Sequence, residues 1–134
     1  MFEIKKITMP LELGNYNEAY SGQVVHVWVN IPREIREKRL ALMRSYAKAL
    51  AEHTTGKALH VIDRIPFVRA WKFRKASKEQ MAMMGEIWSA GADAETHWSA
   101  AEVQTLNDAD PALYMWMARE SMILVDEFRA SKKK

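Results

Sequence analysis

Cysteine is absent from the 134 residues of this chain, and glycine and proline are scarce, with five and four residues. Without cysteine the chain has no disulfide framework and no thiolate metal site, which is typical of a reducing compartment. No apolar run approaches the roughly 18 residues of a membrane span, and the start, Met-Phe-Glu-Ile-Lys-Lys, has no signal-peptide core. The sequence therefore predicts a soluble, cytosolic protein.

Catalytic signatures are also missing. The four histidines are scattered, and the chain has no zinc-binding histidine pair, no glycine-rich phosphate loop and no nucleophile elbow. Asp93, Glu95 and His97 alternate as metal ligands on a strand would, but they lie in what we interpret as a surface loop. We therefore expect no enzyme activity, no cofactor and no metal.

What the chain does have is enough apolar residues for one domain, because 49% of its residues are hydrophobic. Residues 1–30 are strand-rich, 31–56 have a helical pattern, 57–76 are an ambiguous basic segment, and 77–134 are helical in pattern. We therefore expect a single α+β domain with a small N-terminal antiparallel sheet packed against a helical C-terminal half.

Charge is divided unevenly along the chain. Residues 1–78 contain 15 Lys and Arg against 7 Asp and Glu, whereas residues 79–134 contain 5 against 10. Such a bipolar distribution favours head-to-tail association of copies, and it is equally compatible with two solvated faces of one domain.

Two segments of the first 30 residues have strand-like composition. Residues 23–29 are rich in valine with one tryptophan, and residues 2–9 alternate in part between apolar and polar side chains. We predict that they pair. The long connection between them is either a functional surface or an ordinary loop.

A helix is predicted over residues 33–52, ended by Gly56, with apolar residues on one side. That stripe either faces the core or forms a groove for a partner. Its members are Ile35, Leu42, Met43, Tyr46 and Leu50.

Residues 58–75 fit either a strand or a basic extension of the following helix. Ser77 and Gln80 match a capping box, which predicts a helix start at Ser77 and a helix continuing to Gly91. Further along, Ser99 and Glu102 form a second capping box. Asp110 followed by Pro111 predicts the N-terminus of a last helix, which should end near residue 129.

The basic segment has the charges and aromatic side chains of a nucleic-acid-binding surface. The acidic residues of the last helix argue against DNA binding, so we expect nucleic acid to be an improbable partner. The basic residues concerned are Arg64, Arg69, Lys72, Arg74, Lys75 and Lys78.

Several stretches resemble small tail proteins of long-tailed bacteriophages and prophages, above all their tail assembly chaperones. They are Met9-Pro-Leu-Glu-Leu-Gly, Val27-Trp-Val-Asn-Ile-Pro, Glu86-Ile-Trp-Ser, Thr96-His-Trp-Ser-Ala-Ala-Glu-Val and Asp110-Pro-Ala-Leu-Tyr-Met-Trp. The resemblance covers the first 32 residues and about the last 50, and it leaves out the basic middle. It implies a non-catalytic, oligomeric protein of the host cytoplasm that binds the tape measure protein and tail tube subunits.

Aromatic side chains and methionines are the candidate anchors for such partners, since aromatics dominate interface energies. Each of them can instead belong to the core. The candidates are Trp71, Trp88, Trp98, Trp116 and Met117. The alternative functions are a virion structural subunit of the tail or head-tail connector and, less favoured, a nucleic-acid-binding module.

Overall fold

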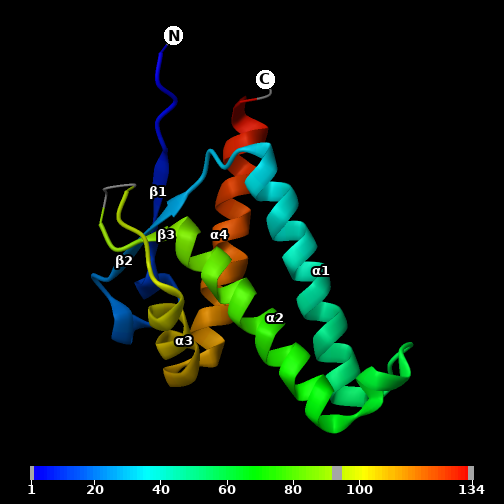
Figure 1. Cartoon of the computed structure of the whole chain (residues 1–134). Coiled ribbons are helices and arrows are strands. Elements are labelled where there is room, and N and C mark those ends of the chain that lie inside the picture. Colours follow the sequence, from blue (N-terminus) through cyan, green and yellow to red (C-terminus); the bar gives the residue numbers. More distant parts are fainter. Residues whose placement is uncertain (1, 92–94, 133–134) are drawn as a thin grey trace. The chain divides into compact units, whose positions relative to one another are not determined.

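The computed structural model describes residues 2–91 and 95–132, which form an α+β fold with a small antiparallel sheet (Figure 1). The chain divides into two compact units. Unit 1 comprises residues 1–32 and 84–134, and unit 2 comprises residues 33–83.

The sheet of unit 1 has the strand order β1-β2-β3, with both pairs antiparallel. Strand β1 (Thr8–Glu12) pairs with β2 (Val24–Trp28), as the sequence predicted for residues 23–29. The first strand itself was placed too early, because residues 2–7 precede β1 and Phe2 and Ile4 are exposed there. Figure 1 shows this segment running beyond the sheet as a blue trace.

Pro10 lies in the middle of β1 without breaking the ladder, because β1 is an edge strand. The amide of Val29 donates to the carbonyl of Ile7, and the amide of Leu13 donates to that of Gln23, so odd-numbered residues of β1 carry the ladder bonds. Pro10 therefore faces the outer edge, where its missing N–H also blunts pairing with another strand.

The connection between β1 and β2 contains two short 3₁₀ turns, η1 (Leu13–Asn15) and η2 (Glu18–Tyr20). The hydroxyl of Tyr20 donates to the carboxylate of Asp110 at 2.8 Å, which raises the pKa of Tyr20 above its ordinary value. This hydrogen bond links the connection between β1 and β2 to the residue that precedes the last helix.

Helices α3 (Ala100–Ala109) and α4 (Pro111–Lys132) begin where the sequence predicted. Ser99 and Glu102 make both bonds of the capping box, and the Asp110 carboxylate accepts the amide of Leu113 at 3.1 Å. Helix α4 contacts β1 and β2, and the buried valines of β2 face the core of this unit.

The third strand corrects the sequence prediction at residue 88. Helix α2 (Pro66–Ile87) ends before Trp88 and does not continue to Gly91, because Trp88–Ser89 forms β3 and pairs with β2. The indole N–H of Trp88 donates to the Ser121 hydroxyl at 2.8 Å, and its ring meets Trp98 and Tyr114 edge-on. Trp88 is therefore the centre of the core of unit 1.

Unit 2 is a pair of helices joined by a short connection. Helix α1 (Arg33–Thr55) is followed by Gly56, whose φ of +72° is the left-handed conformation that glycine adopts after helix ends. The connection contains the 3₁₀ turn η3 (Val61–Arg64).

Helix α2 begins at Pro66, where proline suits the first helical turn. The predicted helix start at Ser77 is wrong, and the interpretation of residues 66–75 as a basic extension of the next helix is confirmed. We call the part of unit 2 formed by α1, the connection and α2 up to residue 83 the hairpin.

Candidate protein-binding surface on the hairpin

Aromatic contacts join the two helices of the hairpin. The ring of Phe73 on α2 stacks on His53 at a centroid distance of 5.0 Å and lies 5.8 Å from the ring of Tyr46. These contacts involve one side of α2 and leave its other sides outside the helix pair.

Burial in the hairpin is slight. Of residues 33–83, all of which the structure describes, only Ala58, Asp63, Met81 and Met83 are buried, and helix α1 has no buried residue. Met43 and Leu50, two members of the predicted apolar stripe, are exposed. A helix pair that buries so few apolar side chains gains little stability of its own, and its apolar surface is available to a partner.

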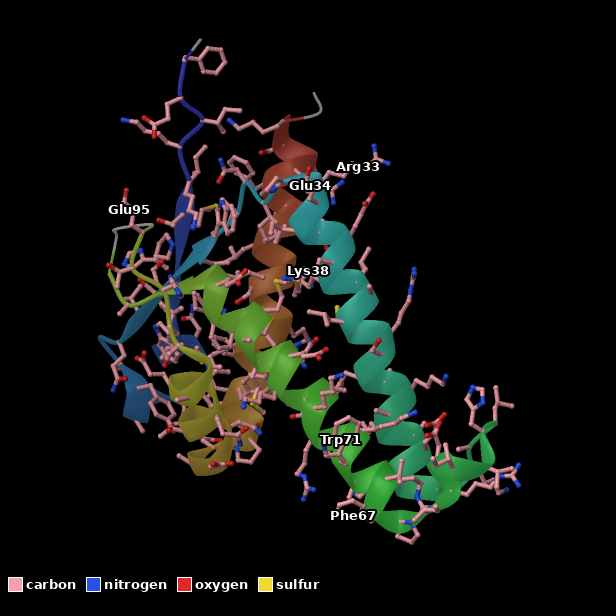
Figure 2. The ribbon with its side chains drawn as sticks, in the orientation of Figure 1. Arg33, Glu34, Lys38, Phe67, Trp71 and Glu95 are labelled. Atoms are coloured by element: carbon pink, nitrogen blue, oxygen red, sulfur yellow. The ribbon has the colours of Figure 1, made fainter. Side chains whose placement is uncertain are left out.

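The most exposed apolar side chains lie in the connection and the first turns of α2. Leu59 is 86% exposed, Phe67 is 74% exposed and Trp71 is 51% exposed. Figure 2 shows Phe67 and Trp71 on successive turns of α2, near its start. We call this surface the hairpin tip, which consists of Leu59, Val61, Ile62, Ile65, Phe67 and Trp71.

Three polar contacts hold the connection in place. Arg64 donates to the carbonyl of Ala58 at 3.0 Å, and Arg69 donates to the carbonyl of Arg64. The ammonium of Lys72 lies 2.6 Å from the carboxylate of Asp63. The side chains of Arg64, Arg69 and Lys72 therefore hold the connection in one conformation.

Asp63 is the one acidic residue among residues 57–78, where seven Lys and Arg are found. The bond from Lys72, helped by the charges of His60 and Lys48, holds the pKa of the buried Asp63 carboxyl below its ordinary value despite its desolvation. The carboxylate thus stays ionised and paired, and the surroundings of the tip are strongly basic.

The basic residues predicted as a patch divide into two groups. Arg64, Arg69 and Lys72 are engaged in fixing the connection. Arg74, Lys75 and Lys78 are exposed on α2, and the Lys75 ammonium lies 5.5 Å from the ring centre of Trp71. Half of the patch therefore has a structural role, and the other half extends the tip along α2.

The candidate anchor residues are not brought together. Trp88 and Met117 are fully buried in unit 1, so they present no surface to a partner. Trp98 is half-buried against Trp88, and Trp116 is half-buried with its ring 5.5 Å from that of Tyr16. Of the five, Trp71 alone is exposed.

The sequence did not predict the aliphatic part of the tip, because Leu59, Val61, Ile62 and Ile65 fit both helix and strand periods. These residues lie between Gly56 and Pro66 among the polar residues His60, Asp63 and Arg64, and their local pattern does not distinguish an exposed connection from a short buried strand.

A hollow of about 360 Å³ lies between the helices of the hairpin. Three basic and three acidic side chains line it, so it has no charge preference. These are Lys48, Lys72 and Lys75 with Glu52, Asp63 and Glu79.

A second hollow, of about 400 Å³, lies beside the β1–β2 connection and is lined by polar residues such as Glu12, Asn15 and Glu18. Over residues 2–91 and 95–132, no three His, Asp or Glu side chains are placed to hold a metal ion. Asp93 of the predicted loop cluster lies outside the described residues.

Within the described part of the chain, none of the helices is both long enough and apolar enough to cross a bilayer. No protein-family model, curated protein or solved structure gives a significant match to this chain. The interpretation of the hairpin tip as a binding surface therefore rests on the exposure of its apolar side chains and on the contacts that hold the connection.

Proposed function

We propose that this chain is a non-catalytic assembly protein whose hairpin tip holds another polypeptide. The observation that carries the proposal is the set of six exposed apolar side chains, four on a connection that polar contacts keep in place and two on the first turns of α2. Full burial of a side chain such as Phe or Leu contributes about 1.5–3 kcal/mol, so a partner that covers even three of them gains substantial affinity.

Within this role, we propose that the chain is a tail assembly chaperone of a long-tailed bacteriophage that binds the tape measure protein and tail tube subunits in the host cytoplasm. The resemblance in residues 1–32 and in the last 50 residues supports this form of the proposal. A chaperone for a long polypeptide needs exposed apolar side chains, and the hairpin provides them.

The test is co-expression with the tape measure protein of the same phage, followed by measurement of its soluble fraction and of its affinity for the purified chain. We expect the double variant Val61→Ser, Ile62→Ser to weaken binding at least tenfold, because about 1.4 kcal/mol corresponds to a factor of ten. Both side chains are exposed, so their replacement leaves the fold intact.

The matched control is Phe2→Ser, Ile4→Ser, which removes two exposed apolar side chains from unit 1. It should bind the tape measure protein like the unaltered chain. Equal loss in both double variants, or no binding by the unaltered chain, contradicts the proposal. Stoichiometric presence of the chain in purified particles indicates a virion structural subunit instead.

A further inference from the structure

The surface around the hairpin tip has no exposed carboxylate over a long stretch of the chain. From residue 53 to residue 78, Asp63 is the only acidic residue, and it is 3% exposed with its carboxylate 2.6 Å from the ammonium of Lys72. Burial and pairing remove this negative charge from the surface. The exposed charged side chains of the same stretch are all cationic, namely Lys57, Arg64, Lys72, Arg74, Lys75 and Lys78.

Exposed side chains follow a definite order along α2. Four of them, at spacings of four, three and four residues, share one side of the helix, namely Phe67, Trp71, Arg74 and Lys78. At a rise of about 1.5 Å per residue, Trp71 lies about 6 Å along the axis from Phe67, and Lys78 lies about 16 Å from it. Figure 2 shows Phe67 near the start of α2 and Trp71 one turn further along. The next acidic residue, Glu79, lies about 100° around the helix from Lys78.

The connection extends the apolar end of this order. It joins the last turn of α1 to the first turn of α2 and closes the end of the helix pair (Figure 1). From this end of the hairpin inward, exposed aliphatic side chains come first, aromatic side chains follow, and the cations of α2 come last. Two cations lie in the connection itself. Arg64 folds back onto the carbonyl of Ala58, and Lys57 has a long flexible stem that lets its ammonium reach away from apolar surroundings.

A lipid leaflet presents the same order of environments. Acyl chains accommodate aliphatic and phenyl side chains, tryptophan is enriched at the level of the headgroups, and anionic headgroups attract Lys and Arg. Apolar surfaces of peripheral proteins enter a leaflet by about 5–10 Å, which is comparable to the step of about 6 Å from Phe67 to Trp71. The ammonium of Lys75 lies 5.5 Å from the ring centre of Trp71, so an apolar ring and a cation meet at the level of the interface.

The hairpin tip fits a bilayer better than a nucleic acid. Single-stranded nucleic acids bind through stacking of bases on aromatic rings and through cations that follow the backbone. Four of the six residues of the tip are aliphatic, and they offer no ring on which a base can stack. Acyl chains, in contrast, are favourable surroundings for all six side chains.

We propose that the empty hairpin tip docks reversibly on an anionic lipid bilayer. The aliphatic side chains of the connection and Phe67 enter the outer part of the acyl region, Trp71 lies at the interface, and the exposed cations of α2 contact lipid phosphates. The inference goes beyond the proposed function, because it requires no phage protein. Both roles use the same side chains, so a bilayer and a client polypeptide compete for the tip.

Vesicle flotation of the full chain tests the docking. We expect the chain to float with vesicles made of equal parts of phosphatidylglycerol and phosphatidylcholine. Binding to vesicles of phosphatidylcholine alone should be at least tenfold weaker, because the cations then face no net negative charge. Higher salt should weaken binding to the anionic vesicles. A chain that floats with neither kind of vesicle, or equally with both, overturns the inference.

The cations of α2 are tested by neutralisation. Arg74→Gln, Lys78→Gln should weaken binding to the anionic vesicles about tenfold. The matched control is Arg33→Gln, Lys38→Gln, which removes two exposed cations at the start of α1, the other end of the hairpin (Figure 2). It should bind like the unaltered chain. Equal loss in both variants reveals a response to net charge alone and overturns docking through the tip.

The apolar side chains are tested by Leu59→Ser, Phe67→Ser, which removes two of the most exposed residues of the tip. This variant should also bind the anionic vesicles at least tenfold more weakly, because it loses apolar surface that enters the leaflet. Phe2→Ser, Ile4→Ser removes two similarly exposed apolar side chains from unit 1 and should bind normally. Circular dichroism checks that the variants fold. Unchanged binding by Leu59→Ser, Phe67→Ser indicates adsorption by charge alone and overturns the insertion.

The depth of the tip is measured with single labels, because the chain has no cysteine of its own. Leu59→Cys, or Thr105→Cys on the exposed side of α3 as a control, receives a fluorophore that acrylamide quenches in water. Anionic vesicles should protect the label at position 59 severalfold and leave the label at position 105 unchanged. No protection at position 59, or equal protection at both positions, overturns insertion of the tip.

Competition separates the two roles of the tip. Added tape measure protein should release the chain from anionic vesicles, and simultaneous binding of both contradicts the shared surface. Vesicle binding without any binding of tape measure protein leaves this inference standing and contradicts the proposed function. Binding of tape measure protein by a chain that never binds vesicles overturns this inference alone.

Discussion

At the scale of single residues, the packing of unit 1 depends on Gly85. This residue lies in α2, and its carbonyl accepts the amide of Trp98 at 3.1 Å. A Cβ atom at position 85 would lie against the carbonyl oxygen of Trp98, a backbone atom that cannot easily move, and close to Val103. The absence of a side chain is therefore what allows residue 98 to approach the helix.

We expect Gly85→Ala to destabilise the protein. Alanine normally gains about 1 kcal/mol over glycine inside a helix, but overpacking of this kind costs about 1–3 kcal/mol and here opposes that gain. The free energy of unfolding in urea should therefore fall. The control is Gly91→Ala, because nothing lies within 4 Å of the added Cβ there. A rise in stability for Gly85→Ala contradicts this account of the packing.

The second residue-scale prediction concerns Ser121, whose hydroxyl accepts from Trp88 and donates to the carbonyl of Met117 at 2.6 Å. Ser121→Ala leaves the buried indole N–H without this partner, which costs about 1–3 kcal/mol. Ser131→Ala on the same helix removes a hydroxyl that bonds the Phe128 carbonyl at an exposed site, so it should change stability little. Thermal unfolding of both variants measures the difference. Equal effects contradict a core role for Trp88.

At the scale of elements, the connection of the hairpin depends on an ionised carboxylate. The bond from Lys72 lowers the pKa of Asp63 in the folded chain below its ordinary value of 3.8. Because the folded pKa is the lower one, the stabilisation is complete above that ordinary value and is lost as pH falls through the folded pKa.

We therefore expect amide hydrogen exchange in residues 58–72 to be constant near neutral pH, after correction for intrinsic rates, and to accelerate in acid. Asp63→Asn should remove this acid sensitivity and raise exchange at neutral pH, since Lys72 then lacks its counter-charge. An acid response that Asp63→Asn leaves unchanged assigns the effect to another group.

Elements with local signals could be predicted from the sequence. Ser99 with Glu102 and Asp110 with Pro111 mark helix starts through bonds within four residues, and both starts are confirmed. Ser77 with Gln80 has the same pattern but lies inside α2, because a short local pattern does not show whether the chain is already helical. Strand β3 has only two residues, and its pairing with β2 some 60 residues away leaves no local trace.

The same distinction applies to the candidate site. Trp71 could be named because tryptophan is a common interface residue. Trp88 was named for the same reason and Met117 as an adaptable apolar side chain, yet both are buried. Which side of a helix becomes covered depends on its neighbours in space and not on its own spacing. The exposure of the aliphatic residues between Gly56 and Pro66 is therefore visible only once the hairpin is known.

At the scale of the whole molecule, the division of charge along the sequence becomes a division between the two units, with the hairpin basic and unit 1 acidic. Interactions between exposed charges are screened over about 8–10 Å at physiological salt. We therefore expect self-association to weaken from 50 mM to 500 mM NaCl by ultracentrifugation, while melting of the chain changes little. Self-association that strengthens with salt indicates a purely apolar contact.

The central claim is that the hairpin tip holds a tail polypeptide, and site-specific photo-crosslinking tests it most directly. A photoreactive residue replaces Ile62 in the tip or, as a control, Thr105 on the exposed side of α3, in bacteria that are assembling tails of the same phage. We predict a crosslink from position 62 to the tape measure protein, identified by mass spectrometry, and none from position 105. No tail protein at position 62, or the same products from both positions, contradicts the claim.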